Sequence, residues 1–372
     1  MGVIQRIDEF QRDRPAVGFP VALIYKFADD QGPFLAALIT YYGFLSLFPL
    51  LLLATSVLGL LLDGDPALRY RILDSTLSQF PVIGEQLSEP RGLQGSPGAI
   101  VVGGVVAIYG AVGVAQAFQN ASNVAWSIPR HRRPNPLKSR LRSAGLLALG
   151  GIAILLTTVL SALAGSSKQF GADLGPLIVP LLFLGAVAVN AGAFLLAFHM
   201  CTVATRRIRT LVPGALTAAT VWQLLQVFGT AYVGHVVRGA GDTYGVFALV
   251  LGLLAWLYLA NVGVVLGIEV NVVLAKRLYP RALLTPFTDD VDLTRGDVAA
   301  YTDAAQAQQA KSFEDVAVTF EDDGQHATAK RRRRRLLRRH LRTPHGSRSD
   351  EASPGDSARR DRPAASDSTD AG

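Results

Sequence analysis

The sequence is poor in the side chains that build disulfides, metal centres and hydrolytic sites. Cys201 is its one cysteine, and the six histidines form neither an HxH nor an HExxH pattern. Metal-dependent phosphodiester cleavage needs clustered ligands, and ATP-driven transport by this chain alone would need a phosphate-binding loop. The sequence has no such pattern. We therefore expect no metal and no cofactor, and we expect that the protein is not an enzyme.

Charged side chains are scarce as well, and they are segregated. They make up 17% of the 372 residues, whereas 50% are hydrophobic, and this separation indicates a membrane protein. Removing the nine Lys and Arg of segment 330–342 changes the formal net charge from +7 to −2. The basic charge therefore belongs to one segment of the tail, and nucleic acid is not the expected partner of the rest of the chain.

Six long apolar runs interrupt the sequence, and together they predict an all-α integral membrane protein with six transmembrane helices. The first run, 34–62, has 29 residues without a charge. A helix rises about 1.5 Å per residue, so about 20 apolar residues cross a hydrocarbon core of roughly 30 Å. The other runs are 99–118, 144–165, 177–198, 211–233 and 246–268.

Basic residues alternate between the connections, which predicts the topology. Connections 130–142 and 206–209 and the N-terminal region are rich in Lys and Arg, whereas the intervening connections hold few. Because a Lys and Arg excess marks the cytoplasmic side, both termini are predicted to be cytoplasmic.

Three regions follow from this pattern. Residues 1–32 are predicted to form a cytoplasmic segment with an interfacial helix at 17–28, in which Lys26 is polar and which Asp29 and Asp30 follow. Residues 33–277 are predicted to form the six-helix domain, and residues 278–372 a tail. Between the first two spans, apolar residues at helical spacing predict a second amphipathic helix. Lys276, Arg277 and Arg281 are expected to anchor the end of the last span, and the polar tail beyond it is expected to be disordered.

The basic segment 330–342 of the tail has three interpretations. At the cytoplasmic face it would contact anionic lipid headgroups, each basic residue contributing about 1 kcal/mol near the surface. Contact with nucleic acid or the ribosome is the alternative, and a solvated charge run without a partner is the simplest one. The lipid-contacting residues would be Lys330, Arg331, Arg332, Arg333, Arg334, Arg335, Arg338 and Arg339.

Polar side chains within the spans are candidates for function, because they are costly inside a bilayer. Glu269 is the only carboxylate in or at the edge of a span. It is predicted to bind a cation, to carry a proton or to contact a substrate headgroup; alternatively, it pairs with an arginine such as Arg277 at the interface and fixes the helix. The residues predicted to line a transport route are Tyr42, Ser46, Asn190, Gln223, Gln226 and Glu269.

Other residues are predicted to shape and pack the helices. Pro49 removes a backbone donor within the first span and predicts a kink there. Gly263 and Gly267, with Asn271 one turn beyond, allow close approach of another helix. Such stripes of small residues more often serve packing within one bundle than self-association. The alternative is that they form the contact face of a homo-oligomer.

Several motifs resemble the YihY/BrkB family of bacterial inner-membrane proteins, once called ribonuclease BN. The likeness covers about residues 16–277, and its carriers are YYGFLSLFPLLLL in the first span, Asn123, Trp126, Trp222, Tyr244-Gly245, Trp256, Tyr258 and GIEVN (267–271). The resemblance implies six helices, a plasma-membrane location and an envelope-associated role. The basic tail is not part of it.

Three functions are compatible with these observations. The first is movement or accommodation of a lipid or another amphipathic molecule by the helix bundle. The second is a non-transporting envelope scaffold whose tail recruits a partner. The third is a membrane-bound nuclease, which the absence of a metal-ligand pattern disfavours.

Overall fold

The computed structural model describes residues 3–61, 97–166, 175–202, 207–232, 242–288 and 291–320. These residues are helical with short connections, and no strand occurs among them. The chain divides into two compact units, 1–320 and 321–372. The expected amphipathic helix after the first span and the basic segment 330–342 lie outside the described residues.

Nine α-helices lie in the part that the structure describes. They are α1 (Val3–Asp13), α2 (Pro15–Asp29), α3 (Gly32–Leu61), α6 (Pro97–Ala125), α7 (Pro136–Ser166), α8 (Gly175–Cys201), α9 (Val212–Tyr232), α10 (Asp242–Lys276) and α11 (Arg295–Gln306). Short 3₁₀ turns, η2 (Arg130–Arg132) and η4 (Ile208–Thr210), precede α7 and α9.

Four stretches of the described helices are long and apolar enough to cross a membrane. They are Val101–Ala125, Pro136–Leu156, Leu184–Cys201 and Val250–Lys276; Gly32–Leu47 in α3 is apolar but shorter. The all-helical membrane protein predicted from the sequence is therefore confirmed, whereas the number of six spans stays a prediction.

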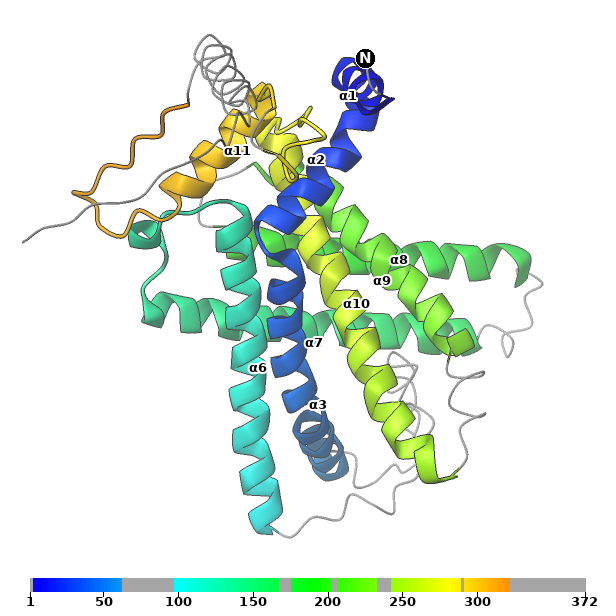
Figure 1. Ribbon diagram of the computed structural model, residues 1–372. Helices are drawn as coiled ribbons and strands as arrows, with labels where there is room; N and C mark the ends of the chain where they lie inside the picture. The colour runs from blue at the N-terminus through cyan, green and yellow to red at the C-terminus, as the bar shows by residue number, and fades with distance from the viewer. Residues whose placement is uncertain are drawn as a thin grey trace, which may run out of the picture. The chain divides into compact units, whose positions relative to one another are not determined.

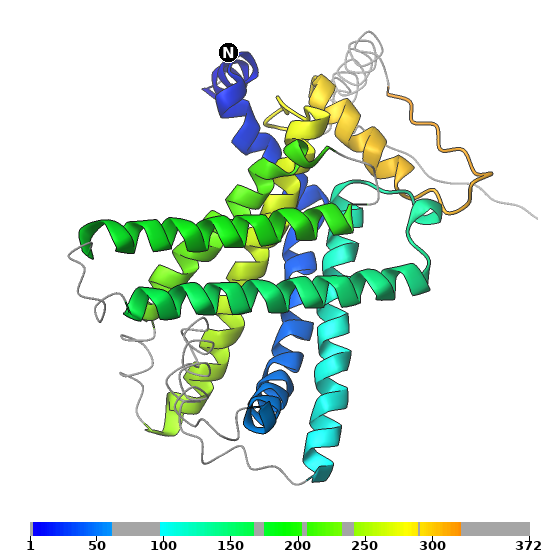
Figure 2. The same ribbon diagram turned by 180° about the vertical axis from the view of Figure 1, so that it is seen from behind.

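The helices run in two directions. Figures 1 and 2 show α3, α6 and α10 extending from the same end of the unit, whereas α7 and α8 lie side by side and cross them steeply. The stacked rings of Phe118 on α6 and Phe198 on α8, 6.0 Å apart, connect the two sets. Pro49 lies inside α3, and the later part of this helix turns away from the earlier part in both views.

The α3–α6 contact depends on glycines. A Cβ on Gly110 would lie 2.6 Å from the Cβ of Ser46, and a Cβ on Gly113 would overlap the ring of Tyr42. The hydroxyl of Ser46 donates to the carbonyl of Gly43 at 3.0 Å. Tyr42 and Ser46, which the sequence analysis assigned to a transport route, thus fill the space that two glycines leave on the facing helix.

The α9–α10 contact is closer still, because the two backbones touch. A Cβ on Gly214 would overlap the carbonyl oxygen of Gly267, and a Cβ on Gly267 would lie 2.7 Å from that of Gly214. The side chain of Asn271 accepts a hydrogen bond from the Gly214 amide at 2.8 Å. That amide is in the first turn of α9, where no intrahelical partner exists. Gly263 meets Val221 further along the same contact.

The segment after α10 differs from the prediction. The sequence analysis expected disorder from residue 278 onward, and this is wrong for residues 278–288 and 291–320. Leu278, Arg281 and Ala282 are buried, and Thr294 with Asp297 forms a capping box that starts α11. Residues of this segment bind α1 and α2: the Leu283 amide donates to Asp8, and Arg281 donates to Asp29. These contacts compensate for the low hydrophobicity of the segment.

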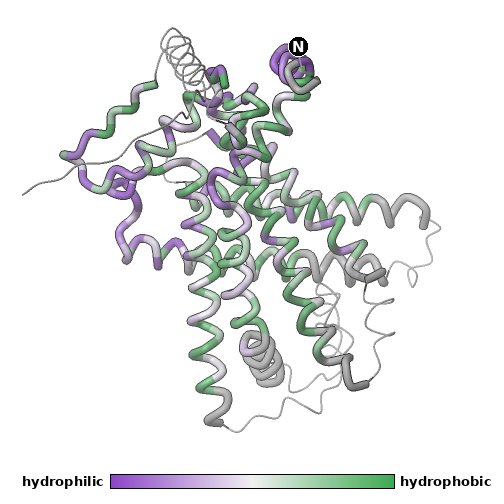
Figure 3. Tube along the Cα trace, viewed as in Figure 1, coloured by the Kyte–Doolittle hydropathy of each residue, from purple (hydrophilic) through white to green (hydrophobic). Residues whose placement is uncertain are grey.

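We call residues 3–30 and 278–306 the cap. Figure 1 shows α1, α2 and α11 together at one end of the aligned helices. Figure 3 shows hydrophilic residues gathered at this end and hydrophobic ones along the helices below it. The Tyr25 hydroxyl donates to the carbonyl of Leu283 at 2.7 Å, which joins the two halves of the cap.

The backbone contact between α9 and α10 yields a stability prediction. Gly214→Ala should lower the free energy of unfolding by about 1–3 kcal/mol, because the added methyl group forces the helices apart. The measurement is the melting temperature of the purified protein in detergent. Gly192→Ala in α8 is the matched control, since nothing lies within 4 Å of its Cβ. Equal melting temperatures for Gly214→Ala and the wild type would contradict the close contact.

Candidate functional site

Three ionisable groups meet where the cap joins the helices, and we call them the Lys26 cluster: Lys26 on α2, Asp30 just after α2, and Glu269 on α10. The Lys26 ammonium donates to a carboxylate oxygen of Asp30 and, at 3.1 Å, to the carbonyl of Ala125 at the end of α6. It lies 3.7 Å from Oε2 of Glu269. One side chain thus connects α2, α6 and α10.

The cluster is removed from solvent. The side chains of Lys26, Asp30 and Glu269 are 3%, 10% and 0% exposed. The carboxyl group of Glu269 lacks hydrogen bonds, because neither Oε atom accepts one from the described residues. Buried carboxylates normally accept several. Glu269 is therefore a buried charge that the fold only partly compensates.

Burial and charge act against each other in this cluster. Burial alone would lower the pKa of Lys26, but the carboxylates of Glu269 and Asp30 raise it above the ordinary value of 10.5. Burial raises the pKa of Asp30 above 3.8, and the Lys26 ammonium offsets part of that effect. Lys26 therefore stays protonated, whereas the two carboxyl groups share a single positive charge.

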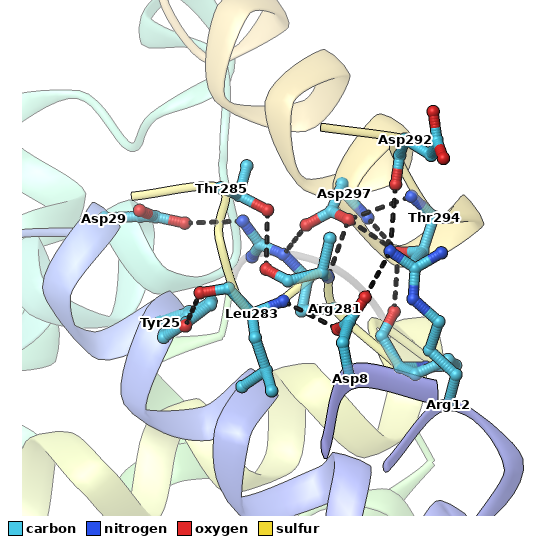
Figure 4. Close-up of polar contacts among 12 residues, drawn as sticks. Asp8, Arg12, Tyr25, Asp29, Arg281, Leu283, Thr285, Asp292, Thr294 and Asp297 are labelled. Carbon is cyan, nitrogen blue, oxygen red and sulfur yellow. Dashed lines mark hydrogen bonds and ion pairs between the residues drawn. The ribbon is translucent and has the colours of Figure 1, made fainter. Parts of the chain in front are cut away.

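Arg281 forms the centre of a second buried group within the cap (Figure 4). Its Nε donates to Asp297 at 2.5 Å and its Nη2 to Asp29 at 3.1 Å, while Tyr301 lies 5.3 Å from the guanidinium carbon. Burial tends to lower the pKa of Arg281, but the hydrogen bond that it donates to Asp297 and the charge of Asp29 raise this pKa above the ordinary value. The expected anchor at the end of the last span is thus an internal ion pair.

The two ends of the ordered unit are fastened together around Arg281. Gln11 on α1 donates to the carbonyl of Arg281 at 2.5 Å, and the Leu283 amide donates to Asp8 at 2.9 Å. Arg12 donates to the carbonyl of Asp292 at 3.1 Å (Figure 4). Asp29 and Asp30 are adjacent in sequence, so the Arg281 group and the Lys26 cluster adjoin.

The predicted transport-route residues are distributed over several contacts. Tyr42 and Ser46 pack on α6, Asn190 is half-buried on α8, and Gln223 and Gln226 are half-buried on α9. Among these and Glu269, the structure surrounds only Glu269 with charged groups in the part of the chain that it describes.

Sequence reasoning selected Glu269 and offered an arginine such as Arg277 as one alternative partner. Arg277 is exposed, and Glu269 faces Lys26 instead. Lys26 and Asp30 were treated as the polar side of an interfacial helix, although their spacing of four residues predicts a helical ion pair. Asp297 was missed, and Arg281 was expected only to anchor the end of the last span, because the segment beyond it was treated as disordered. The Thr294-x-x-Asp297 pattern was the available signal.

The Lys26 cluster predicts an unusual dependence of stability on pH in one variant. Lys26→Met leaves two buried carboxylates without a counter-charge. The substitution should therefore lower the free energy of unfolding by about 3–5 kcal/mol near neutral pH. The pKa of Asp30 in the folded state is already above its unfolded value, so the folded state binds the proton more tightly. The free energy of unfolding of the variant should therefore rise as the pH falls from the raised pKa toward 3.8. Thermal melts across the acidic range measure this.

Lys276→Met is the control. Lys276 also pairs with a carboxylate, Asp303 at 2.8 Å, but both side chains are partly exposed. Its removal should cost about 1 kcal/mol or less, without recovery in acid. If Lys26→Met and Lys276→Met lost the same unfolding free energy and depended on pH in the same way, the buried charges of the Lys26 cluster would have no special effect on stability.

Comparison with known proteins identifies a family and several relatives that match much of the chain. The family described as virulence factor BrkB matches residues 23–289. A UPF0761 membrane protein from Aromatoleum aromaticum is 29% identical over 209 residues, covering 53% of this chain and 48% of the relative. One from Stenotrophomonas maltophilia is 27% identical over 279 residues, covering 73% and 64%. One from Pseudoalteromonas translucida is 25% identical over 276 residues, covering 72% and 88%.

The match thus spans about half to two thirds of the length of the first two relatives. No solved structure is similar to the chain. The family match includes Lys26, Asp30 and Glu269, and therefore the whole Lys26 cluster; it also includes Asp29 and Arg281, whereas Asp297 lies beyond it. Together with the apolar helices, it shows that this chain belongs to the BrkB family of membrane proteins.

Proposed function

We propose that the protein is a multi-pass plasma-membrane protein that moves or accommodates a lipid-like amphipathic molecule, and that the Lys26 cluster acts on its charged part. A single observation carries the proposal: Glu269 is fully buried near the end of an apolar helix, and neither of its oxygens accepts a hydrogen bond from the residues that the structure describes. An ion pair that only fixed a helix would satisfy those oxygens, since uncompensated buried charge is costly.

The apolar environment favours an amphipathic substrate over a hydrophilic one. α3 and α9 carry no Asp, Glu, Lys, Arg or His, and α10 has its one buried acid close to the cap. A molecule with an acyl chain and a headgroup matches this distribution, because its chain would contact the apolar helices and its headgroup the charged end. We further propose that segment 330–342 holds the tail near anionic headgroups.

A scaffold is the second candidate, and the cap favours it. Hydrogen bonds donated by Gln11 and Arg12, and one that Asp8 accepts from the Leu283 amide, fasten the N-terminal helices to segment 281–292. Such a rigid end would present a fixed surface to a partner. In that case the Lys26 cluster would serve only to hold the cap, and movement of lipid would not depend on it.

Reconstitution distinguishes the two functions. The full chain in sealed vesicles should move a fluorescent short-chain phospholipid between leaflets, measured by quenching from outside. Glu269→Gln should slow this by about tenfold or more, equivalent to about 1.4 kcal/mol on the rate, because the charge acting on the headgroup is lost. Leu259→Ala, an exposed position on the same helix, is the matched control and should behave as the wild type.

A truncation after Phe320 completes the test, because it removes the second unit and leaves the cap intact. Movement of lipid should largely survive it. Vesicles that move no phospholipid, or a Glu269→Gln variant equal to the wild type, would contradict the transport proposal. Loss of an envelope phenotype on truncation alone would support the scaffold.

The six-span topology is best tested on α7, because α7 and α8 cross the aligned helices steeply. In a Cys201→Ser background, Arg132→Cys precedes α7 and Lys168→Cys follows it. If α7 spans the bilayer, a membrane-impermeant maleimide should label Arg132→Cys only from the cytoplasmic side and Lys168→Cys only from outside. Labelling of both from one side would mean that α7 lies across the bundle without spanning it.

A further inference from the structure

The Lys26 cluster contains one more negative group than positive groups. Lys26 supplies one positive charge, and Asp30 and Glu269 supply two negative charges when both are ionised. The adjoining cap does not correct the balance, because Arg281 already serves both Asp29 and Asp297. A net negative charge in a buried site is costly and favours uptake of a cation or a proton.

Hydrogen bonding shows where the additional group belongs. Lys26 gives its hydrogen bonds to Asp30 and to the carbonyl of Ala125, and it is 3.7 Å from Glu269. Both oxygens of Glu269 lack a donor among the described residues. The carboxyl groups of Glu269 and Asp30 both lie within ion-pair distance of the same Lys26 ammonium, which places them next to each other.

We propose that Glu269 and Asp30 form a proton-binding site, in which a single proton shared between the two carboxyl groups neutralises the Lys26 cluster. Uptake takes one proton from water and changes the charge of the cluster from −1 to zero, and release reverses both. A metal cation is the weaker alternative, since the ammonium already lies between the oxygens and no group of three or more His, Cys, Asp or Glu among the described residues suits a metal.

The residues around the two carboxyl groups offer the proton a route from solvent, and they add no further free charge to the site. Asp30 retains 10% exposure and adjoins the more exposed Asp29, whereas Glu269 is 0% exposed, so the proton enters through Asp30. α3 and α9 contribute no charged side chain, and α6 contributes the Ala125 carbonyl. On α10 itself, Lys276 is held by Asp303 and by the carbonyl of Trp126.

This inference deepens the proposed function, on which it rests for its biological role: the proton would be the ion coupled to movement of the amphiphile. Protonation removes net charge from the cluster and completes the hydrogen bonding of Glu269. The protonated and deprotonated states therefore differ in how strongly the cap attracts a charged headgroup.

Infrared difference spectroscopy of the full-length protein in nanodiscs tests the site without any transport assay. On acidification from neutral pH, the wild type should gain the carbonyl-stretch band of a protonated carboxyl group. Glu269→Gln and Asp30→Asn should each lose this band. Asp303→Asn, which removes a partly exposed and ion-paired acid at the same end, should keep it. A wild type without a titrating band, or a band that persists in both variants, would overturn the proposal.

A variant that changes neither carboxyl group provides a second readout. Lys26→Met should shift the midpoint of the band upward by about one pH unit or more, since the ammonium no longer favours the ionised form. An unchanged or lowered midpoint would overturn the shared site.

The transport assay then separates the two proposals. If the band titrates as expected and the vesicles move no phospholipid at any pH, the proton site stands and the proposed function fails. If phospholipid moves at a rate independent of pH, the site again stands and its coupling to movement is overturned.

Discussion

The placement of an ammonium group in a dry region between α2, α6 and α10 is the constraint on which the rest of the structure depends. Because the Lys26 ammonium is buried, solvent cannot take the place of its partners. It therefore holds α2 next to the Ala125 carbonyl at the end of α6 and next to Glu269 on α10, and it also binds Asp30. α2 in turn holds the cap through Tyr25 and Asp29. The apolar helices alone would give the cap no defined position, because hydrophobic contacts are not directional.

Close backbone packing supplies the rigidity that such a site needs. Gly214 and Gly267 let α9 and α10 touch, and Asn271 fastens them two residues beyond Glu269. The position of the Glu269 carboxyl group is therefore determined by a helix that is held on both sides. A side chain on a loosely packed helix would approach water or the cap and lose its isolation.

The sequence allowed the fold to be predicted where one physical effect dominated. It did not allow prediction where several weak effects acted together. Apolar runs predicted an all-helical membrane protein because the cost of exposed backbone in lipid outweighs other terms. Glu269 was predicted to matter for a similar reason. Its partner was not, because Lys26 is more than 240 residues away and its burial depends on tertiary packing. Residues 278–306 were misjudged because their composition is polar, although the partners of Arg281 and Asp297 compensate for it.

The fastening of α1 to segment 281–292 has a consequence for biosynthesis. The hydrogen bond from Gln11 to Arg281 joins residues 270 positions apart, and that from Leu283 to Asp8 joins residues 275 apart. The N-terminal helices leave the ribosome long before residues 281 and 283 are synthesised, so these hydrogen bonds cannot form until translation has passed both positions. Closure of the cap is therefore a late event of assembly, and a chain interrupted before residue 281 lacks the groups that Gln11 and Asp8 bind in that segment.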